Sequence, residues 1–360
     1  MSPRRPTLLL TCGDPAGIGP EIVARAMKSA PLRRVARLAV VGDAEIFERA
    51  LHHTGHTGRT GRPGARAKLR VVRPDDFDPK DDAPGILLLA SSDEGWTSVS
   101  PGHATAGSGR AAARAIEAAA RLALERRADG IVTAPISKLA LRMAGYPHPG
   151  HTEFLGALTN APETRMLFVT RRFRLILATV HLALRDVPGA LSVPSLVRTI
   201  EFAAAASRNF RWGARRPVAL LGLNPHAGEE GLFGDEEERV ILPAIREAGA
   251  RGISAEGPFP ADTFFSSHAG RKEWGAVIAM YHDQGLIPAK ADGVGGAANV
   301  TLGLPFVRSS VDHGTAFDRA WKVSRIAANR PDPAGLMTAI RVGADLALRG
   351  GRQPLEWAWP

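Results

Sequence analysis

Three apolar runs, far apart in the chain, are each followed within three residues by a histidine. Residues 175–180 precede His181, residues 217–223 precede His226, and residues 275–280 precede His282. Short apolar runs of this kind predict buried strands of a parallel sheet. Such strands end along one edge, where ligands bind in open α/β sheets. If the three strands share a sheet, the pattern predicts three neutral imidazoles at one edge, a donor set that suits Zn²⁺ or a similar divalent ion. Three unrelated loop histidines are the alternative.

The rest of the chain alternates between strand-like and helix-like segments. Strands are predicted at residues 7–11, 38–43, 85–90 and 130–135, and helices at 110–127 and 332–348. This alternation favours an α/β class with a mainly parallel sheet. At 360 residues, of which 44% are hydrophobic, the chain is long for one compact domain and suggests two lobes.

Composition narrows the classes of protein and of partner. No run of apolar residues is long enough to span a membrane, and the N-terminal run is too short for a signal peptide. The single cysteine, Cys12, forms no internal disulfide and is typical of a cytoplasmic protein. The net charge of +10 favours anionic small molecules. The basic segment 59–73 is rich in glycine and lacks aromatic residues, which indicates a loop and no nucleic-acid partner.

Several polar residues stand where a substrate or cofactor could bind. In the turn 13–21, glycines and Pro20 at a helix start predict free amides for an anion near Gly17 and Ile18, although a plain strand-to-helix turn is the alternative. His151 and Thr152 could donate hydrogen bonds to a substrate, unless Thr152 only caps a helix. Two further groups follow strands or turns: Lys290, Asn299 and Arg308, and the carboxylates Asp262 and Asp283. Surface salt bridges are the alternative for Lys290 and Arg308.

Six sequence motifs then point to a family. The segments GDPAGIGPE at 13–21, GHTEF at 150–154, LNPHAGE at 223–229, PADT at 260–263, YHDQG at 281–285 and NVTLGLPFVR at 299–308 occur in this order. The chain resembles the 4-hydroxythreonine-4-phosphate dehydrogenase family of vitamin B6 biosynthesis from about residue 7 to residue 318.

The resemblance implies a two-lobed, isocitrate/isopropylmalate dehydrogenase-like α/β fold with a cleft between the lobes. Residues 1–133 and 293–360 would form the cofactor lobe, and residues 134–292 the metal, substrate and dimer lobe. It also implies a homodimer whose subunits share each active site. A divalent metal (Zn, Mg or Co) and NAD or NADP would be the cofactors.

The resemblance also assigns roles to individual residues. His181, His226 and His282 would bind the metal, and Lys290, Asp262 and Asp283 are the candidate catalytic residues. The phosphorylated substrate would contact His151, Thr152, Lys290, Asn299 and Arg308. The cofactor would contact Gly17 and Ile18 together with His313, Gly314 and Thr315, in a loop similar to the adenine-side loop of related dehydrogenases.

The implied reaction oxidises 4-phosphohydroxy-L-threonine, with hydride passing to the nicotinamide and CO₂ leaving afterwards. Lys290 could neutralise the phosphate or transfer a proton. The alternatives are a dehydrogenase of 4-phosphoerythronate or 4-phosphothreonate or of an aromatic-acid dihydrodiol, a three-histidine metallohydrolase, and a basic non-enzymatic binding protein. The chain departs from the family pattern at residues 319–325, where a Gly-Lys stretch is usual, and this leaves the choice between NAD and NADP open. Ala183 replaces a frequent proline.

Overall fold

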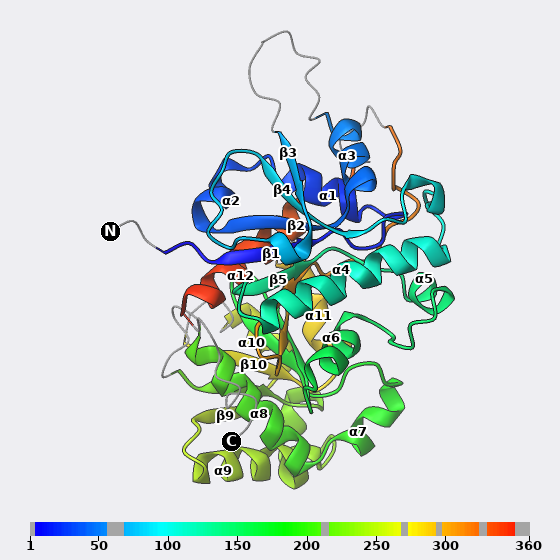
Figure 1. Ribbon diagram of the computed structural model, residues 1–360. Helices are drawn as coiled ribbons and strands as arrows, with labels where there is room; N and C mark the ends of the chain where they lie inside the picture. Colours follow the sequence, from blue (N-terminus) through cyan, green and yellow to red (C-terminus); the bar gives the residue numbers. More distant parts are fainter. Residues whose placement is uncertain are drawn as a thin grey trace. The chain divides into compact units, whose positions relative to one another are not determined.

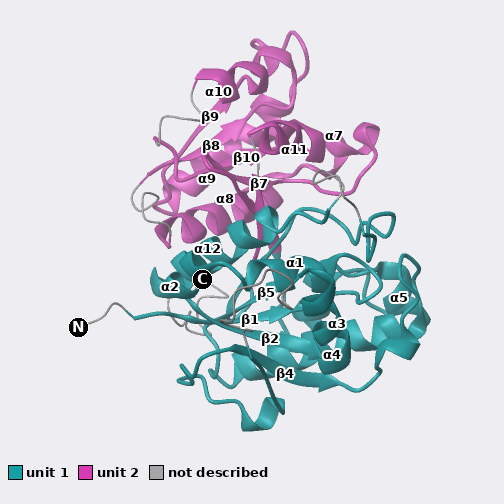
Figure 2. Ribbon diagram, turned by 90° about the horizontal axis from the view of Figure 1, so that it is seen from above, with its two compact units in different colours: residues 1–164, 304–360 teal, residues 165–303 magenta. Residues whose placement is uncertain are grey.

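The computed structural model describes residues 4–55, 68–209, 216–267, 273–292, 297–323 and 330–349 (Figure 1). The chain divides into two compact units (Figure 2). Unit 1 comprises residues 1–164 and 304–360, and unit 2 comprises residues 165–303. Most of the basic segment 59–73 lies outside the described residues.

The unit boundaries differ from those expected at residues 133/134 and 292/293. Helices α5 (Lys138–Met143) and α6 (His151–Thr159) stay with unit 1 because they pack on α4 (Ala106–Leu124). Strand β11 (Ala298–Leu302) stays with unit 2 because it pairs with β6 (Arg165–Val169). The chain therefore leaves unit 1 later, and returns to it later, than the sequence indicated.

The strands of unit 1 are all parallel and run in the order β3-β4-β2-β1-β5-β12. Their bounds are β1 (Thr7–Thr11), β2 (Arg37–Asp43), β3 (Leu69–Val72), β4 (Ile86–Ser92), β5 (Gly130–Thr133) and β12 (Val307–Ser310). The four strands predicted in this part of the sequence are thereby confirmed. Strands β3 and β12 were not predicted, because each has only four residues and contains or adjoins charged side chains.

Helices cover both faces of the unit 1 strands. Helix α4 lies across one face, and the other carries α1 (Gly19–Ala26), α2 (Ala30–Val35), α3 (Ala44–His53) and α12 (Ala334–Arg349). Helix α4 begins at a capping box, in which the Ser108 amide donates to Thr105 Oγ1 and the Thr105 amide to Ser108 Oγ. It ends before Arg126, whose φ of 59° is left-handed. The helix predicted at residues 110–127 is thus confirmed, although it begins and ends about one turn earlier in the sequence.

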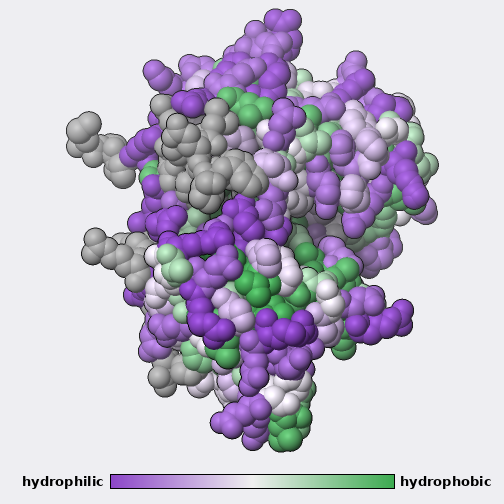
Figure 3. Space-filling model, turned by 90° about the horizontal axis from the view of Figure 1, so that it is seen from below, coloured by the Kyte–Doolittle hydropathy of each residue, from purple (hydrophilic) through white to green (hydrophobic). Residues whose placement is uncertain are grey.

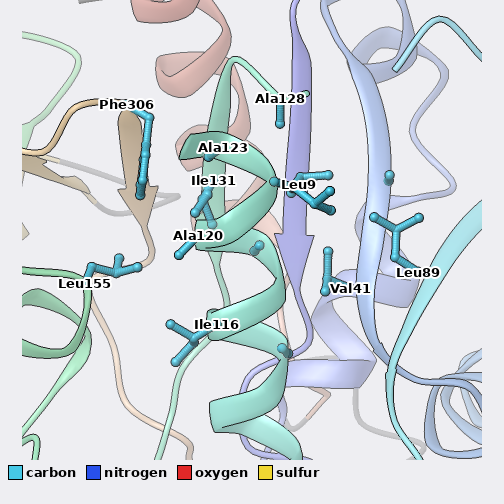
Figure 4. Packing of buried hydrophobic residues seen from close by; sticks show 14 of the residues in the cluster. Leu9, Val41, Leu89, Ile116, Ala120, Ala123, Ala128, Ile131, Leu155 and Phe306 are labelled. Atoms are coloured by element: carbon cyan, nitrogen blue, oxygen red, sulfur yellow. The ribbon is translucent and has the colours of Figure 1, made fainter. Parts of the chain in front are cut away.

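The core of unit 1 lies between α4 and the strands (Figure 4). Leu9, Val41 and Ile131 project from the strands toward Ile116 of α4, and Phe306 packs against the same cluster. Burying each large apolar side chain contributes about 1.5–3 kcal/mol. The alanines of α4 allow its backbone to approach the sheet closely. This layer holds the adjacent strands β5 and β12, which carry Thr133 and Arg308.

Unit 2 has the strand order β11-β6-β7-β10-β8-β9, in which β7, β10, β8 and β9 are parallel. Strand β6 runs antiparallel to β7 and β11, because a tight turn at Thr170 joins β6 directly to β7. The remaining bounds are β7 (Arg174–Leu177), β8 (Val218–Leu221), β9 (Ala255–Phe259) and β10 (Ala276–Ala279). The mainly parallel α/β class is confirmed, and the three strands predicted to precede histidines lie side by side.

Helices also flank both faces of the unit 2 strands. One face carries α8 (Val193–Arg208) and α9 (Leu242–Ala250), and the other carries α10 (Ala261–Ser267) and α11 (His282–Ala291). Short helical segments of unit 2 lie between these elements: η3 (Leu184–Asp186), α7 (Val187–Ala190), η4 (Pro225–Gly228) and η5 (Glu237–Ile241). The corresponding short segments of unit 1 are η1 (Pro74–Asp76) and η2 (Trp96–Ser98). Among the helices of the described residues, none has both the length and the apolar character needed to cross a membrane.

Candidate active site

The three histidines of the predicted metal site lie at the carboxyl ends of adjacent strands of unit 2. His181 follows β7, His282 begins α11 directly after β10, and His226 lies in η4 after β8. The rings of His181 and His282 are 5.7 Å apart between centroids. His282 Nδ1 lies 2.7 Å from Asp283 Oδ1. A proton shared in that contact leaves Nε2 of His282 with its lone pair available to a metal ion.

His226 stands apart from this pair. Its side chain is exposed and its ring centroid lies 6.0 Å from that of Phe233. Within the part of the chain that the structure describes, no three His, Cys, Asp or Glu side chains gather into a metal-binding group. The structure therefore brings two of the three predicted ligands together. The chemistry of the donor set, imidazoles at the carboxyl ends of adjacent strands, fits a divalent transition metal.

A second group of polar residues lies in unit 1 around Arg308. This arginine, on β12, is 3% exposed, and its Nη2 donates a 2.7 Å hydrogen bond to Thr133 Oγ1. Burial lowers the pKa of Arg308 to about 10, and Glu153 opposes that effect. The guanidinium therefore stays cationic at neutral pH. A buried cation beside hydrogen-bond donors suits a phosphate or a carboxylate.

His151 is the neutral member of this group. Burial, and then the charge of Arg308, lower its pKa well below the usual value, so the ring is neutral near pH 7. Its Nε2 is buried without a hydrogen-bond partner among the described residues. The N-cap of α6 is Gly150, so the interpretation of Thr152 as the capping residue is wrong. Thr152 instead lies in the first turn of the helix, beside His151.

The other predicted substrate and catalytic residues belong to unit 2. Lys290 is exposed near the end of α11, and Asp262 is exposed in the first turn of α10. Asp283 is exposed beside His282. Asn299 lies on β11, with Nδ2 3.7 Å from Met166 Sδ and with a buried Oδ1 that has no hydrogen-bond partner within the described segments. The Asn299 oxygen is therefore a candidate acceptor for a bound group.

The two predicted cofactor segments lie side by side in unit 1. The Ile18 amide donates to the Thr315 carbonyl at 2.9 Å, and a Cβ added to Gly17 would lie 2.8 Å from the same oxygen. His313 and Gly314 are exposed at the tip of their loop. The amides near Gly17 were expected to be free for an anion, but those of residues 16–18 bond to Asp14 or Thr315. Any contact with a cofactor here therefore uses other atoms of the turn.

Sequence reasoning missed a cluster built on Trp321. Its Nε1 donates to the Pro15 carbonyl at 2.8 Å, and its amide donates to Glu21 Oε1 at 2.7 Å. The Trp96 ring stacks edge-on against it, 4.7 Å between centroids. Trp321 has a φ of 58°, a left-handed conformation that is unfavourable for a bulky side chain. The signal was the departure from the family's Gly-Lys stretch; residues 324 and 325 of that segment lie outside the described part.

Comparisons with known proteins show the family of the chain. The family described as "Pyridoxal phosphate biosynthetic protein PdxA" matches residues 34–342. The 4-hydroxythreonine-4-phosphate dehydrogenase of Geobacter metallireducens is 41% identical over 345 residues, which cover 95% of this chain and 96% of that protein. The D-threonate 4-phosphate dehydrogenase of Cupriavidus necator is 40% identical, covering 97% of this chain and 99% of that one.

A solved structure extends the similarity to the fold. The crystal structure of 4-hydroxythreonine-4-phosphate dehydrogenase from Klebsiella pneumoniae superposes with a TM-score of 0.80 at 38% identity, covering 95% of this chain and 99% of that one. Sequence and fold therefore agree over nearly the whole length. The chain belongs to the PdxA family of pyridoxal phosphate biosynthetic proteins.

Proposed function

We propose that this protein is an NAD(P)-dependent dehydrogenase that oxidises 4-phosphohydroxy-L-threonine on the route to pyridoxal phosphate. The observation that carries the proposal is the near-full-length similarity to 4-hydroxythreonine-4-phosphate dehydrogenases. D-threonate 4-phosphate is the second candidate substrate, because a relative named for it is 40% identical. Both compounds carry a secondary alcohol, a carboxylate and a phosphate.

Residues of unit 1 would hold one anionic end of such a substrate. Arg308 supplies a buried cation, and its Thr133 contact fixes the direction in which the guanidinium points. His151 is neutral, so its buried Nε2 can donate or accept a hydrogen bond without adding charge. Thr152 adds a hydroxyl in the same helical turn. Asn299 and Lys290, which belong to unit 2, are the other candidate substrate-binding residues.

His181, His226 and His282 would hold the divalent ion, for which Zn, Mg and Co are the candidates. When bound, the ion would polarise the substrate hydroxyl and so ease the loss of its proton. Asp283, whose Oδ1 lies 2.7 Å from Nδ1 of His282, would hold a proton at that nitrogen. Lys290 and Asp262, both exposed on helices of unit 2, are the candidates for moving a proton. Gly17, Ile18, His313, Gly314 and Thr315 would border NAD or NADP.

A second copy of the chain would complete the site. Exposed apolar side chains occur in the loops and helix that carry the three histidines. Leu184 is 67% exposed, Leu232 is 72% exposed and Ile287 is 68% exposed. Apolar residues also reach the surface as a patch on one largely hydrophilic face (Figure 3). A contiguous apolar patch, unlike a single exposed side chain, is typical of an interface. We infer a homodimer, located in the cytoplasm, without nucleic-acid or membrane partners.

The test measures nicotinamide reduction by absorbance with each phosphorylated acid, with NAD and with NADP, before and after treatment with a chelator. We expect reduction that needs metal and that is fastest with 4-phosphohydroxy-L-threonine. Faster turnover of D-threonate 4-phosphate would favour the second candidate. Release of phosphate without any nicotinamide reduction would refute the dehydrogenase and support a metallohydrolase.

A further inference from the structure

The loop that carries His226 has an unusual backbone. Six consecutive residues have left-handed φ values between 42° and 87°: His226, Ala227, Gly228, Glu229, Glu230 and Gly231. Residues other than glycine avoid this region because Cβ approaches the backbone too closely. A run of this kind persists only when its surroundings hold it in place. The question is therefore what fixes this loop, and with it the direction of the His226 side chain.

The buried carboxylate of Glu237, on η5, provides the anchor. Its Oε1 accepts hydrogen bonds from the Leu223 amide at 2.7 Å and from the Asn224 amide at 2.8 Å, and its Oε2 accepts from Asn224 Nδ2 at 2.8 Å. Glu237 is 3% exposed. A Cβ added to Gly228 would lie 2.8 Å from Oε2, so the carboxylate fills the inside of the loop. The anchored residues come immediately before Pro225 and His226.

Gln284 links this loop to the strand that precedes His282. Its Oε1 accepts from the Met280 amide at 2.7 Å, and its Nε2 donates to the Gly222 carbonyl at 2.7 Å. Thr179 Oγ1 donates to the Met280 carbonyl at 2.7 Å, which adds the strand before His181. A continuous set of hydrogen bonds within unit 2 therefore joins the three strand ends that carry histidines.

We propose that Glu237 and Gln284 are positioning residues for the histidine set, with Glu237 fixing the His226 loop and Gln284 fixing that loop to the β10 end. This inference rests on the proposed function, because it takes the three histidines to be the metal ligands. Partners of metal ligands that lie outside the coordination sphere commonly change affinity 10–100-fold when they are replaced. Neither residue touches the metal in this proposal, and both act through the backbone.

The experiment titrates the metal-free, full-length protein with Co²⁺ and follows the visible absorption of the bound ion, which reports its coordination geometry. The variant Glu237→Gln keeps the side-chain shape but has one acceptor oxygen facing three N–H donors. We expect about 10–100-fold weaker Co²⁺ binding and an altered spectrum. Glu238→Gln is the matched control, because Glu238 is the exposed neighbour with the same charge. It should bind Co²⁺ as the wild type does.

A second variant keeps the test decisive if Glu237→Gln does not fold, as judged by circular dichroism. Gln284→Glu retains an acceptor for the Met280 amide but turns an oxygen toward the Gly222 carbonyl. We expect weaker Co²⁺ binding here as well. If Glu237→Gln folds and binds Co²⁺ with the affinity and spectrum of the wild type, the inference is overturned and the proposed function is not. If Glu237→Gln does not fold, the same result in Gln284→Glu overturns the inference. Unchanged Co²⁺ binding in His226→Ala would instead refute the metal assignment of the proposed function.

Discussion

Replacing Asp14 with asparagine should remove a large part of the pH dependence of stability. Asp14 is wholly buried, and one oxygen, Oδ1, accepts from the Ala16 amide at 2.9 Å. The other oxygen has no hydrogen-bond partner in the described segments. Burial raises the pKa of Asp14 to about 6 from 3.8, and the Ala16 amide and then the nearby Ser108 hydroxyl partly oppose this. The folded protein therefore holds this proton more tightly than the unfolded chain does.

The sign and size of the effect follow from that difference in pKa. The stabilisation is complete below the unfolded value of 3.8 and is lost as pH rises through about 6. Its full size is about 3 kcal/mol, of which about 1.4 kcal/mol remains near pH 5 and almost none near pH 8. The Asp14→Asn variant keeps an acceptor for the Ala16 amide but has no charge to bury. Relative to the wild type, it should gain about 1.4 kcal/mol between pH 5 and pH 8.

The assay is unfolding in urea near pH 5 and near pH 8, for the wild type, Asp14→Asn and the control Asp93→Asn. The Asp93 side chain is 95% exposed, so its replacement tests the loss of a carboxylate without burial. A free-energy difference between Asp14→Asn and the wild type that is the same at both pH values would refute the reasoning. It would mean that Asp14 is not an uncompensated buried carboxylate.

Four further outcomes are expected. Replacing Thr133 with valine removes the acceptor of Arg308 Nη2. The free energy of unfolding should fall by about 1.5–3 kcal/mol, and KM for the phosphorylated substrate should rise. Unchanged urea unfolding and an unchanged KM would contradict this prediction. Trp321→Phe keeps the packing but loses the bond to Pro15, which should cost about 1 kcal/mol in thermal unfolding. Trp321→Gly relieves the left-handed φ but loses the ring, for a net loss of about 1–3 kcal/mol; a more stable glycine variant would show that the stacking contributes little. Leu232→Glu should weaken the proposed homodimer, because it places a charge in an apolar interface, as sedimentation would detect; an unchanged dimer would place the interface elsewhere.

The parts of the fold that sequence predicted are those with strong local patterns. The runs that became β1, β2, β7, β8 and β10 are continuous apolar stretches, and α4 is a long alanine-rich segment. Strands that are buried on both faces consist almost entirely of apolar residues, so they can be recognised in the sequence. Strand β9, Ala255–Phe259, was not predicted because its residues are only partly buried and include Gly257 and Pro258. The pairing of β6 with β11 joins segments that are far apart in the chain, and no local pattern encodes it.

Some residues of the candidate site could be placed from the sequence, and others could not. The positions of His181 and His282 after neighbouring strands follow from the sheet-edge rule, and the structure brings their rings together. The surroundings of His226 depend on Glu237, whose buried partners include backbone amides that no sequence pattern identifies. Trp321 was noticed only as a departure from a pattern. Its contacts with Pro15 and Glu21 span about three hundred residues of chain and could not be read locally.

The divided organisation of unit 1 has a consequence for protein synthesis. The strand β12 and the helix α12 are translated only after all of unit 2, yet β12 pairs with β5 and α12 packs on β1, β5 and β12. A nascent chain that has reached residue 303 therefore holds an incomplete first unit, with apolar side chains such as Leu8 lacking their helical cover. It also lacks Arg308, the buried cation of the candidate substrate site. Exposed apolar surface of this kind makes an incomplete chain prone to aggregation until α12 is added.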